Sequence, residues 1–146
     1  MTTTGRVISL PGWTEPAYKI VGTVVGLGLG IMSALWEVMV SPMHVTIGGT
    51  IVRVPLATLL AIVGNVGLVW FMRTVTGRLP LAVLPGVAWF AVMFAASTKT
   101  SEGDLLITGD NWVGVTTILL GSVAWAGAAY LLMSRRRRPE ADDPRS

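Results

Sequence analysis

Four long uncharged segments constrain this chain more than any other feature of its sequence. The segments cover residues 20–36, 54–72, 79–98 and 111–134, and they contain 17, 19, 20 and 24 residues. A helix needs about 20 mostly apolar residues to span a bilayer. The segments do not alternate apolar and polar residues with period two, as the strands of a membrane β-barrel do. The sequence therefore predicts an all-α membrane protein with four transmembrane helices.

The low charge content supports this assignment, and the positions of the charged and apolar residues divide the chain into three regions. Only 13% of the residues are charged, whereas a soluble domain has about 25%. We expect the four helices over residues 18–40, 54–72, 79–98 and 112–133, with a charged residue tolerated near the end of the first. The transmembrane domain then occupies 18–133, after a cytoplasmic N-terminal segment at 1–17. Residues 134–146 are polar and contain two prolines, so we expect a disordered tail.

The basic residues are divided unequally between the two sides of the predicted bundle. Nine of the eleven fall on the side of both termini: Arg6, Lys19, Arg73, Arg78, Arg135, Arg136, Arg137, Arg138 and Arg145. The other side has only Arg53 and Lys99. Because Lys and Arg are enriched in cytoplasmic loops, we expect a multi-pass protein of the plasma (inner) membrane with both termini in the cytoplasm.

Four consecutive arginines, Arg135 to Arg138, directly follow the last apolar segment. In a soluble protein with a net charge of +3 such a run would raise the possibility of nucleic-acid binding. After an apolar segment it is typical of an anchor that stops translocation, and a site for lipid headgroups is the less favoured alternative. We therefore expect the lipid bilayer as a partner and no nucleic acid.

The first loop on the opposite side resembles a short hairpin. Two β-branched runs flank Gly48-Gly49 between His44 and Arg53, and a two-residue Gly-Gly connection between such runs is typical of a β-hairpin. Residues 104–108 of the second loop offer a third short strand. The sequence thus predicts a small extracytoplasmic β-hairpin element of two or three strands, with irregular loops as the alternative.

Small residues recur at every fourth position of the first predicted helix and share one of its faces. They are Gly22, Gly26, Gly30 and Ala34. Small residues at this spacing let a second helix approach closely. We interpret this face as a helix-packing surface, whose partner helix lies either in the same chain or in another one. A glycine-lined substrate path is the less favoured alternative.

Four hydrogen-bonding side chains fall at comparable depth near the middle of the last three predicted helices. They are Asn65, Trp89, Ser122 and Trp125. A buried amide or indole N–H needs an acceptor, so we expect these residues to form one polar layer inside the bundle. A packed and hydrogen-bonded core is the favoured interpretation of this layer, and a small binding cavity is the alternative.

Glu37 is the one acidic residue within a predicted span. An ionisable residue inside a membrane is a functional-site hypothesis by default. Glu37 comes late in its helix, and Arg53 lies at the start of the next. We therefore expect an ion pair between Glu37 and Arg53 at the outer rim, with a proton- or cation-coupling role for Glu37 as the alternative.

The sequence offers little for catalysis or metal binding. The chain has no cysteine and one histidine, which excludes disulfides, thiolate chemistry and Cys- or His-rich metal sites. It also lacks a glycine-rich phosphate loop, H-E-x-x-H and G-x-S-x-G. Glu102, Asp104 and Asp110 cluster in one loop but match no calcium-loop spacing. We predict that the protein is not an enzyme and binds no metal or cofactor.

One loop carries a resemblance to a known family. Ser101-Glu102-Gly103-Asp104-Leu105-Leu106 leads through Gly109 into a span rich in glycine and alanine, and Leu84-Pro85 and Trp89 precede it. This arrangement resembles a family of small four-helix actinobacterial membrane proteins of unknown function, often encoded beside the mycothiol-pathway deacetylase. The resemblance covers roughly residues 18–133 and singles out Glu102, Gly103 and Asp104. It implies a four-helix membrane fold and no activity, cofactor or site residue.

Two functions follow as hypotheses. The first is a non-enzymatic accessory or assembly subunit of the plasma membrane, which packs against a partner protein through the face of Gly22 to Gly30. The second is a homo-oligomeric transporter or channel for a small molecule or ion. It would use the polar layer around Asn65 and Trp89, with Glu37 as the coupling group.

Overall fold

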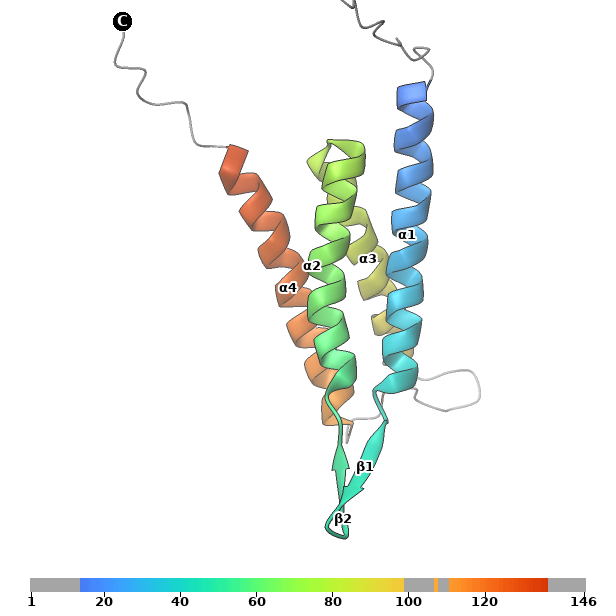
Figure 1. Ribbon diagram of the computed structural model, residues 1–146, viewed down its shortest axis with the longest axis vertical. Coiled ribbons are helices and arrows are strands. Elements are labelled where there is room, and N and C mark those ends of the chain that lie inside the picture. The colour runs from blue at the N-terminus through green and yellow to red at the C-terminus, as the bar shows by residue number, and fades with distance from the viewer. Residues whose placement is uncertain (1–13, 99–106, 108–110, 137–146) are drawn as a thin grey trace, which may run out of the picture.

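A computed structural model describes residues 14–98, 107 and 111–136, which form four helices and one β-hairpin (Figure 1). In chain order the elements are α1 (Thr14–Val40), β1 (His44–Ile47), β2 (Thr50–Arg53), α2 (Leu56–Thr76), α3 (Leu79–Ala96) and α4 (Trp112–Arg136). All four helices are long and apolar enough to cross a membrane. The predicted helical fold class with four such helices and a small β element is thereby confirmed. The predicted structure of residues 1–13 and 137–146 lies outside the described residues.

The helices form a bundle around α2, which packs against each of the other three, while α3 also contacts α1 and α4. The β-hairpin projects from one end, which we call the hairpin end (Figure 1). The start of α1, the α2–α3 turn and the end of α4 lie at the opposite end, which we call the terminal end. Towards the terminal end α4 diverges from α2 (Figure 1). The end of α4 therefore stands apart from α2, whereas α1 and α2 stay in close contact near the terminal end, where a Cβ at Gly22 would overlap the Val75 side chain.

Local sequence explains how the chain reverses between the helices. Gly77 ends α2 in the left-handed region at φ +66° and donates its N–H to the Arg73 carbonyl. Arg78 is extended, and Pro80 then falls in the first turn of α3, where a missing N–H carries no penalty. At the start of α4, the Asn111 side-chain oxygen accepts the N–H of Gly114 at 3.3 Å and so caps the helix.

The predicted hairpin is confirmed with two strands. β1 and β2 are antiparallel in a register that pairs His44 with Arg53 and Ile47 with Thr50. Gly48 and Gly49 connect them at φ +58° and +82°, the conformation that a tight two-residue turn requires. The possible third strand at residues 104–108 lies outside the described residues except for Ile107.

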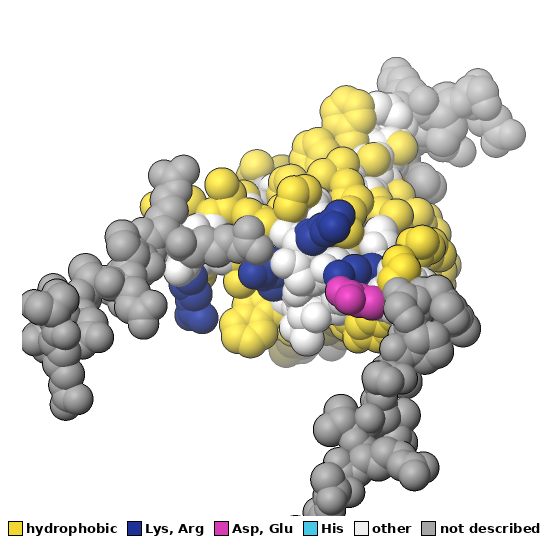
Figure 2. Space-filling view, turned by 90° about the horizontal axis from the view of Figure 1, so that it is seen from above, with side chains coloured by type: hydrophobic (Ala, Val, Ile, Leu, Met, Phe, Trp, Pro, Cys, Tyr) yellow, Lys and Arg dark blue, Asp and Glu magenta, His cyan; other side chains and the backbone are white. Residues whose placement is uncertain are grey.

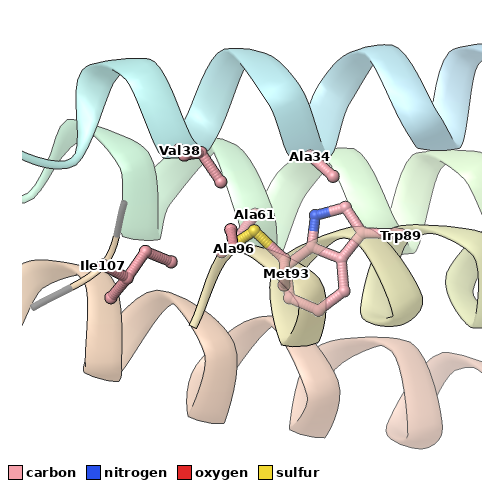
Figure 3. Packing of buried hydrophobic residues seen from close by; sticks show 7 residues of the cluster. All are labelled: Ala34, Val38, Ala61, Trp89, Met93, Ala96 and Ile107. Carbon is pink, nitrogen blue, oxygen red and sulfur yellow. The ribbon is translucent and has the colours of Figure 1, made fainter. Parts of the chain in front are cut away.

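The main cluster of buried apolar side chains, drawn in Figure 3, lies towards the hairpin end, as the positions of its residues in the helices show. Its buried apolar side chains are Ala34, Val38, Ala61, Trp89, Met93, Ala96 and Ile107. Ile107 belongs to the chain between α3 and α4, and its N–H donates to the Ala96 carbonyl at 3.1 Å. This contact places the Ile107 side chain, 5% exposed, over the hairpin end of the core.

The outer surface is strongly apolar along the helices. Large hydrophobic side chains are exposed on each of them, such as Val24 on α1, Val63 on α2, Phe94 on α3 and Val123 on α4. Basic side chains gather instead at the terminal end, where Figure 2 shows them beside an acidic side chain. Lys19, Arg73 and Arg135 lie on the helices at that end, and Arg78 lies in the turn between α2 and α3. An apolar belt with a basic end is the surface expected of a membrane-spanning bundle.

Candidate functional site

A buried carboxylate is the most unusual group in the interior. Glu37, one turn before the end of α1, is 1% exposed. Its Oε2 accepts the indole N–H of Trp89 at 2.8 Å, and its Oε1 accepts the Ser33 hydroxyl at 2.7 Å. Figure 3 shows the indole nitrogen of Trp89 pointing from α3 towards α1. Both oxygens of Glu37 are thus bound by uncharged donors.

This arrangement corrects the predicted ion pair of Glu37 with Arg53. Within the described residues the carboxylate is hydrogen-bonded to Ser33 and Trp89, and Arg53 is not among its partners. The physical reason is the direction of the side chain. Glu37 shares its helix face with the core residue Ala34 and so points into the bundle, whereas Arg53 is half-buried at the end of β2, outside the helices.

The hairpin end of the bundle covers Glu37. Ser41, one turn further along the chain, is fully buried, and its hydroxyl accepts a hydrogen bond from the Asn111 side chain at 3.0 Å. Asn111 is 2% exposed, and Ile107 packs beside it against Gly114. These buried side chains therefore follow Glu37 at the hairpin end of the bundle.

A groove between α1 and α2 leads to the same carboxylate from the side. It has a volume of about 440 Å³ and is lined by Leu29, Met32, Ser33, Trp36, Glu37, Leu60, Val63 and Gly64. A second groove of about 390 Å³ shares Leu29, Ser33 and Gly64 and continues past Gly67 to Phe71. A Cβ at Gly64 would lie 3.3 Å from the Ser33 hydroxyl oxygen and 4.0 Å from Oε1 of Glu37. The missing side chain at Gly64 therefore leaves room beside Ser33 and Glu37, although Glu37 itself is 1% exposed.

The four residues of the predicted polar layer are hydrogen-bonded separately. The Asn65 amide donates to the Gly121 carbonyl at 3.3 Å, and the Trp125 indole donates to the Val83 carbonyl at 3.2 Å. The Ser122 hydroxyl donates within its own helix. Among the described residues, the Asn65 side-chain oxygen is buried without a hydrogen-bond partner. Each predicted donor finds an acceptor, but the structure does not join the four side chains into one connected layer.

Sequence reasoning did not pair Trp89 with Glu37. Glu37 lies three residues before the end of α1, and Trp89 lies seven before the end of α3. At 1.5 Å per residue these positions differ in depth by about 6 Å, a distance that two long side chains can span. Two features of the sequence could have suggested this pair. A buried indole N–H needs an acceptor, and an isolated acid within a predicted span needs donors.

The small-residue face of α1 is buried within the chain. A Cβ at Gly22 or Gly26 would overlap the side chains of Val75 or Met72 on α2. At Gly30 it would lie 2.6 Å from the backbone oxygen of Pro85 on α3. Ala34 continues the face into the core. The partner helices of this face are therefore α2 and α3 of the same chain.

A hydroxyl cluster between α2 and α4 was not predicted. The Thr58 hydroxyl lies 3.0 Å from that of Thr117 and 3.2 Å from that of Thr116. Thr117 also donates to the Val113 carbonyl at 2.7 Å. Each threonine taken alone is an ordinary helix residue, so only the packing of α2 against α4 reveals the cluster.

The remaining sequence-predicted positions are Glu102, Gly103 and Asp104, which lie outside the described residues. Within the described residues, no three His, Cys, Asp or Glu side chains are grouped closely enough to hold a metal ion. Comparison of the chain with protein-family models, curated proteins and solved structures finds no match. The resemblance to the actinobacterial family therefore stays a prediction.

Proposed function

We propose that this chain is a multi-pass protein of the plasma (inner) membrane with both termini in the cytoplasm, and that it acts as a non-enzymatic accessory or assembly subunit. The four apolar helices and their exposed hydrophobic side chains support the membrane location. The basic side chains at the terminal end support the orientation, because such residues favour the cytoplasmic side. The resemblance to the actinobacterial family supports the same architecture.

The open groove between α2 and α4 carries the proposed subunit role. The face of Gly22 to Gly30 is already covered by the chain's own helices, so a partner helix needs another surface. The groove has a volume of about 360 Å³, and Ala124, Gly127 and Ala128 line it together with Trp70. A Cβ at Gly127 would meet no atom within 4 Å. Small residues beside open space allow the close backbone approach by which membrane helices associate.

Blocking this groove tests the subunit role. The tagged protein is purified in mild detergent from its native membrane, and the size of the complex is measured. We expect a complex with a second membrane protein that Gly127→Leu disrupts. Gly28→Leu is the matched control, since Gly28 also faces open space but lies on α1. An unchanged complex in Gly127→Leu would remove the groove from the proposal.

Reporter fusions test the orientation. Alkaline phosphatase is active only outside the cytoplasm, so we expect an inactive fusion after Ser146 and an active one inserted between Gly48 and Gly49. Activity at the C-terminus would reverse the proposed topology.

A second candidate function is transport or conduction by a homo-oligomer. The buried carboxylate of Glu37, bound by neutral donors within the described residues, favours it. Proton-coupled or cation flux into liposomes is the measurement, and Glu37→Gln should abolish it. Normal flux in that variant would exclude Glu37 from the mechanism.

A further inference from the structure

We propose that the groove between α1 and α2 binds an organic cation that has one positive charge and an apolar body, with the charge paired to Glu37. The inference concerns occupancy of the groove alone. It depends on neither the accessory role nor transport.

The first step is the charge of the site. Glu37 is 1% exposed, and both of its carboxylate oxygens accept hydrogen bonds from neutral groups, those of Ser33 and Trp89. Neutral donors can hold either form of a carboxyl group, but burial disfavours the ionised form unless a cation lies close to it. The ion pair found within the described residues joins Lys19 to Glu15 near the start of α1, at the terminal end. A bound ligand with one positive charge would stabilise the ionised form of Glu37.

The second step is the shape and chemistry of the groove. Apart from Ser33 and Glu37, its lining is apolar and includes Leu29, Met32 and Val63. The groove continues along α2 past Gly67, where an added Cβ would meet no atom within 4 Å. One carboxylate and one hydroxyl are too few for a hard metal ion, which takes six or more oxygen ligands. The lining therefore fits a hydrophobic body attached to a single cationic group.

Trp36 adds a second feature that suits a cation. It lines the groove beside Glu37, and its side chain is 63% exposed. A cation near the face of an indole ring is attracted by the ring's quadrupole. Carboxylate and indole together favour an ammonium group over a neutral ligand of the same shape.

The route into the site also favours an amphiphilic ligand. Ser41, one turn beyond Glu37, is buried at the hairpin end together with Asn111 and Ile107. The groove opens sideways between α1 and α2, on the apolar exterior of the bundle. In the proposed membrane a ligand enters from the lipid phase, which excludes small hydrophilic cations and admits amines that partition into the bilayer.

Dansylcadaverine and its N-acetyl derivative test the proposal on the unmodified protein. The two probes share one fluorescent apolar body, but only the first carries an ammonium group. The full chain is placed in nanodiscs of phosphatidylcholine, which is zwitterionic, and probe binding is titrated by dansyl fluorescence against empty nanodiscs. We expect the amine to bind at least about tenfold more tightly than the acetylated probe, as one charge-assisted contact allows. Equal affinities would overturn the proposal without recourse to any variant.

Two variants and one control locate the binding. Glu37→Gln should abolish the preference for the amine, and Gly64→Val should weaken binding of both probes by filling the groove while the charge of Glu37 is kept. Gly28→Val, on α1 but outside the groove, should bind like the wild type. A preserved amine preference in folded Glu37→Gln would show that the charge is recognised elsewhere and would overturn the assignment. Thermal unfolding of each variant identifies any that fails to fold.

Discussion

The indole nitrogen of Trp89 lies 2.8 Å from Oε2 of Glu37 and joins α3 to α1 in the interior of the bundle. Each of the two side chains is 1% exposed. Ser33 completes the set from within α1. Among the described residues, Glu37 is the least exposed acid and Trp89 the least exposed tryptophan. Their hydrogen bond therefore pairs a buried donor with a buried acceptor on two different helices.

Trp89→Phe should destabilise the fold by about 1–3 kcal/mol, because it keeps most of the ring but leaves one buried carboxylate oxygen without a donor. The measurement is equilibrium unfolding in detergent. Trp36→Phe is the control, since Trp36 is 63% exposed, and it should change stability little. Equal stability of both variants would mean that the hydrogen bond contributes nothing measurable.

Gly30→Ala should destabilise the bundle by about 1–3 kcal/mol through overpacking. Its Cβ would lie 2.6 Å from the Pro85 carbonyl oxygen, and a backbone atom cannot move aside as a flexible side chain can. Gly28→Ala on the same helix meets open space and should be neutral or stabilising by up to about 1 kcal/mol. In thermal unfolding, Gly30→Ala should therefore unfold at a lower temperature than the wild type and Gly28→Ala at the same or a higher one, and the reverse order would contradict the packing of α1 against α3.

Thr58→Val should cost about 0.5–2 kcal/mol, the range found for hydrogen bonds between membrane helices. The loss stays small because Thr117 keeps its bond to the Val113 carbonyl. Thr74→Val is the matched control, because the Thr74 hydroxyl is exposed and donates within its own helix. If unfolding in detergent gives the same result for both, the hydroxyl cluster between α2 and α4 does not stabilise the bundle.

Gly48→Ala should destabilise the hairpin by about 1–2 kcal/mol, since φ is +58° there and L-residues disfavour that region. A Cβ at this position meets no atom within 4 Å, so the effect is conformational rather than steric. Hydrogen exchange should accelerate at residues 44–53 and stay unchanged in α1 and α2. Exchange that accelerates in the helices as well would show that the hairpin supports the bundle.

The helices and the hairpin were predictable because their signals are local. Uncharged length identifies each span, and the ends agree with the structure to within four residues, as for α1 at Val40 and α2 at Thr76. The hairpin depends on Gly48-Gly49, whose positive φ values no other pair in that loop supplies as easily. Such features need no knowledge of neighbouring helices.

The site was less predictable because it depends on how the helices are rotated about their axes. Counting residues assigned Glu37 to the rim and Trp89 to the centre, and it did not show that they face each other. The same limit applies to Asn65, which was expected to join a polar layer and instead bonds to the Gly121 carbonyl. Side-chain partners across helices are set by rotation and tilt, which hydropathy alone does not encode.

The hydrogen bond between Glu37 and Trp89 also sets an order of assembly. The two residues are 52 positions apart, and at a synthesis rate of about 5–20 residues per second the second follows the first by roughly 3–10 s. During that interval α1 holds its carboxylate with Ser33, its partner on the same helix. The hydrogen bonds of Glu37 are therefore complete only after α3 has been made, so the interior of the bundle takes its final form late in synthesis.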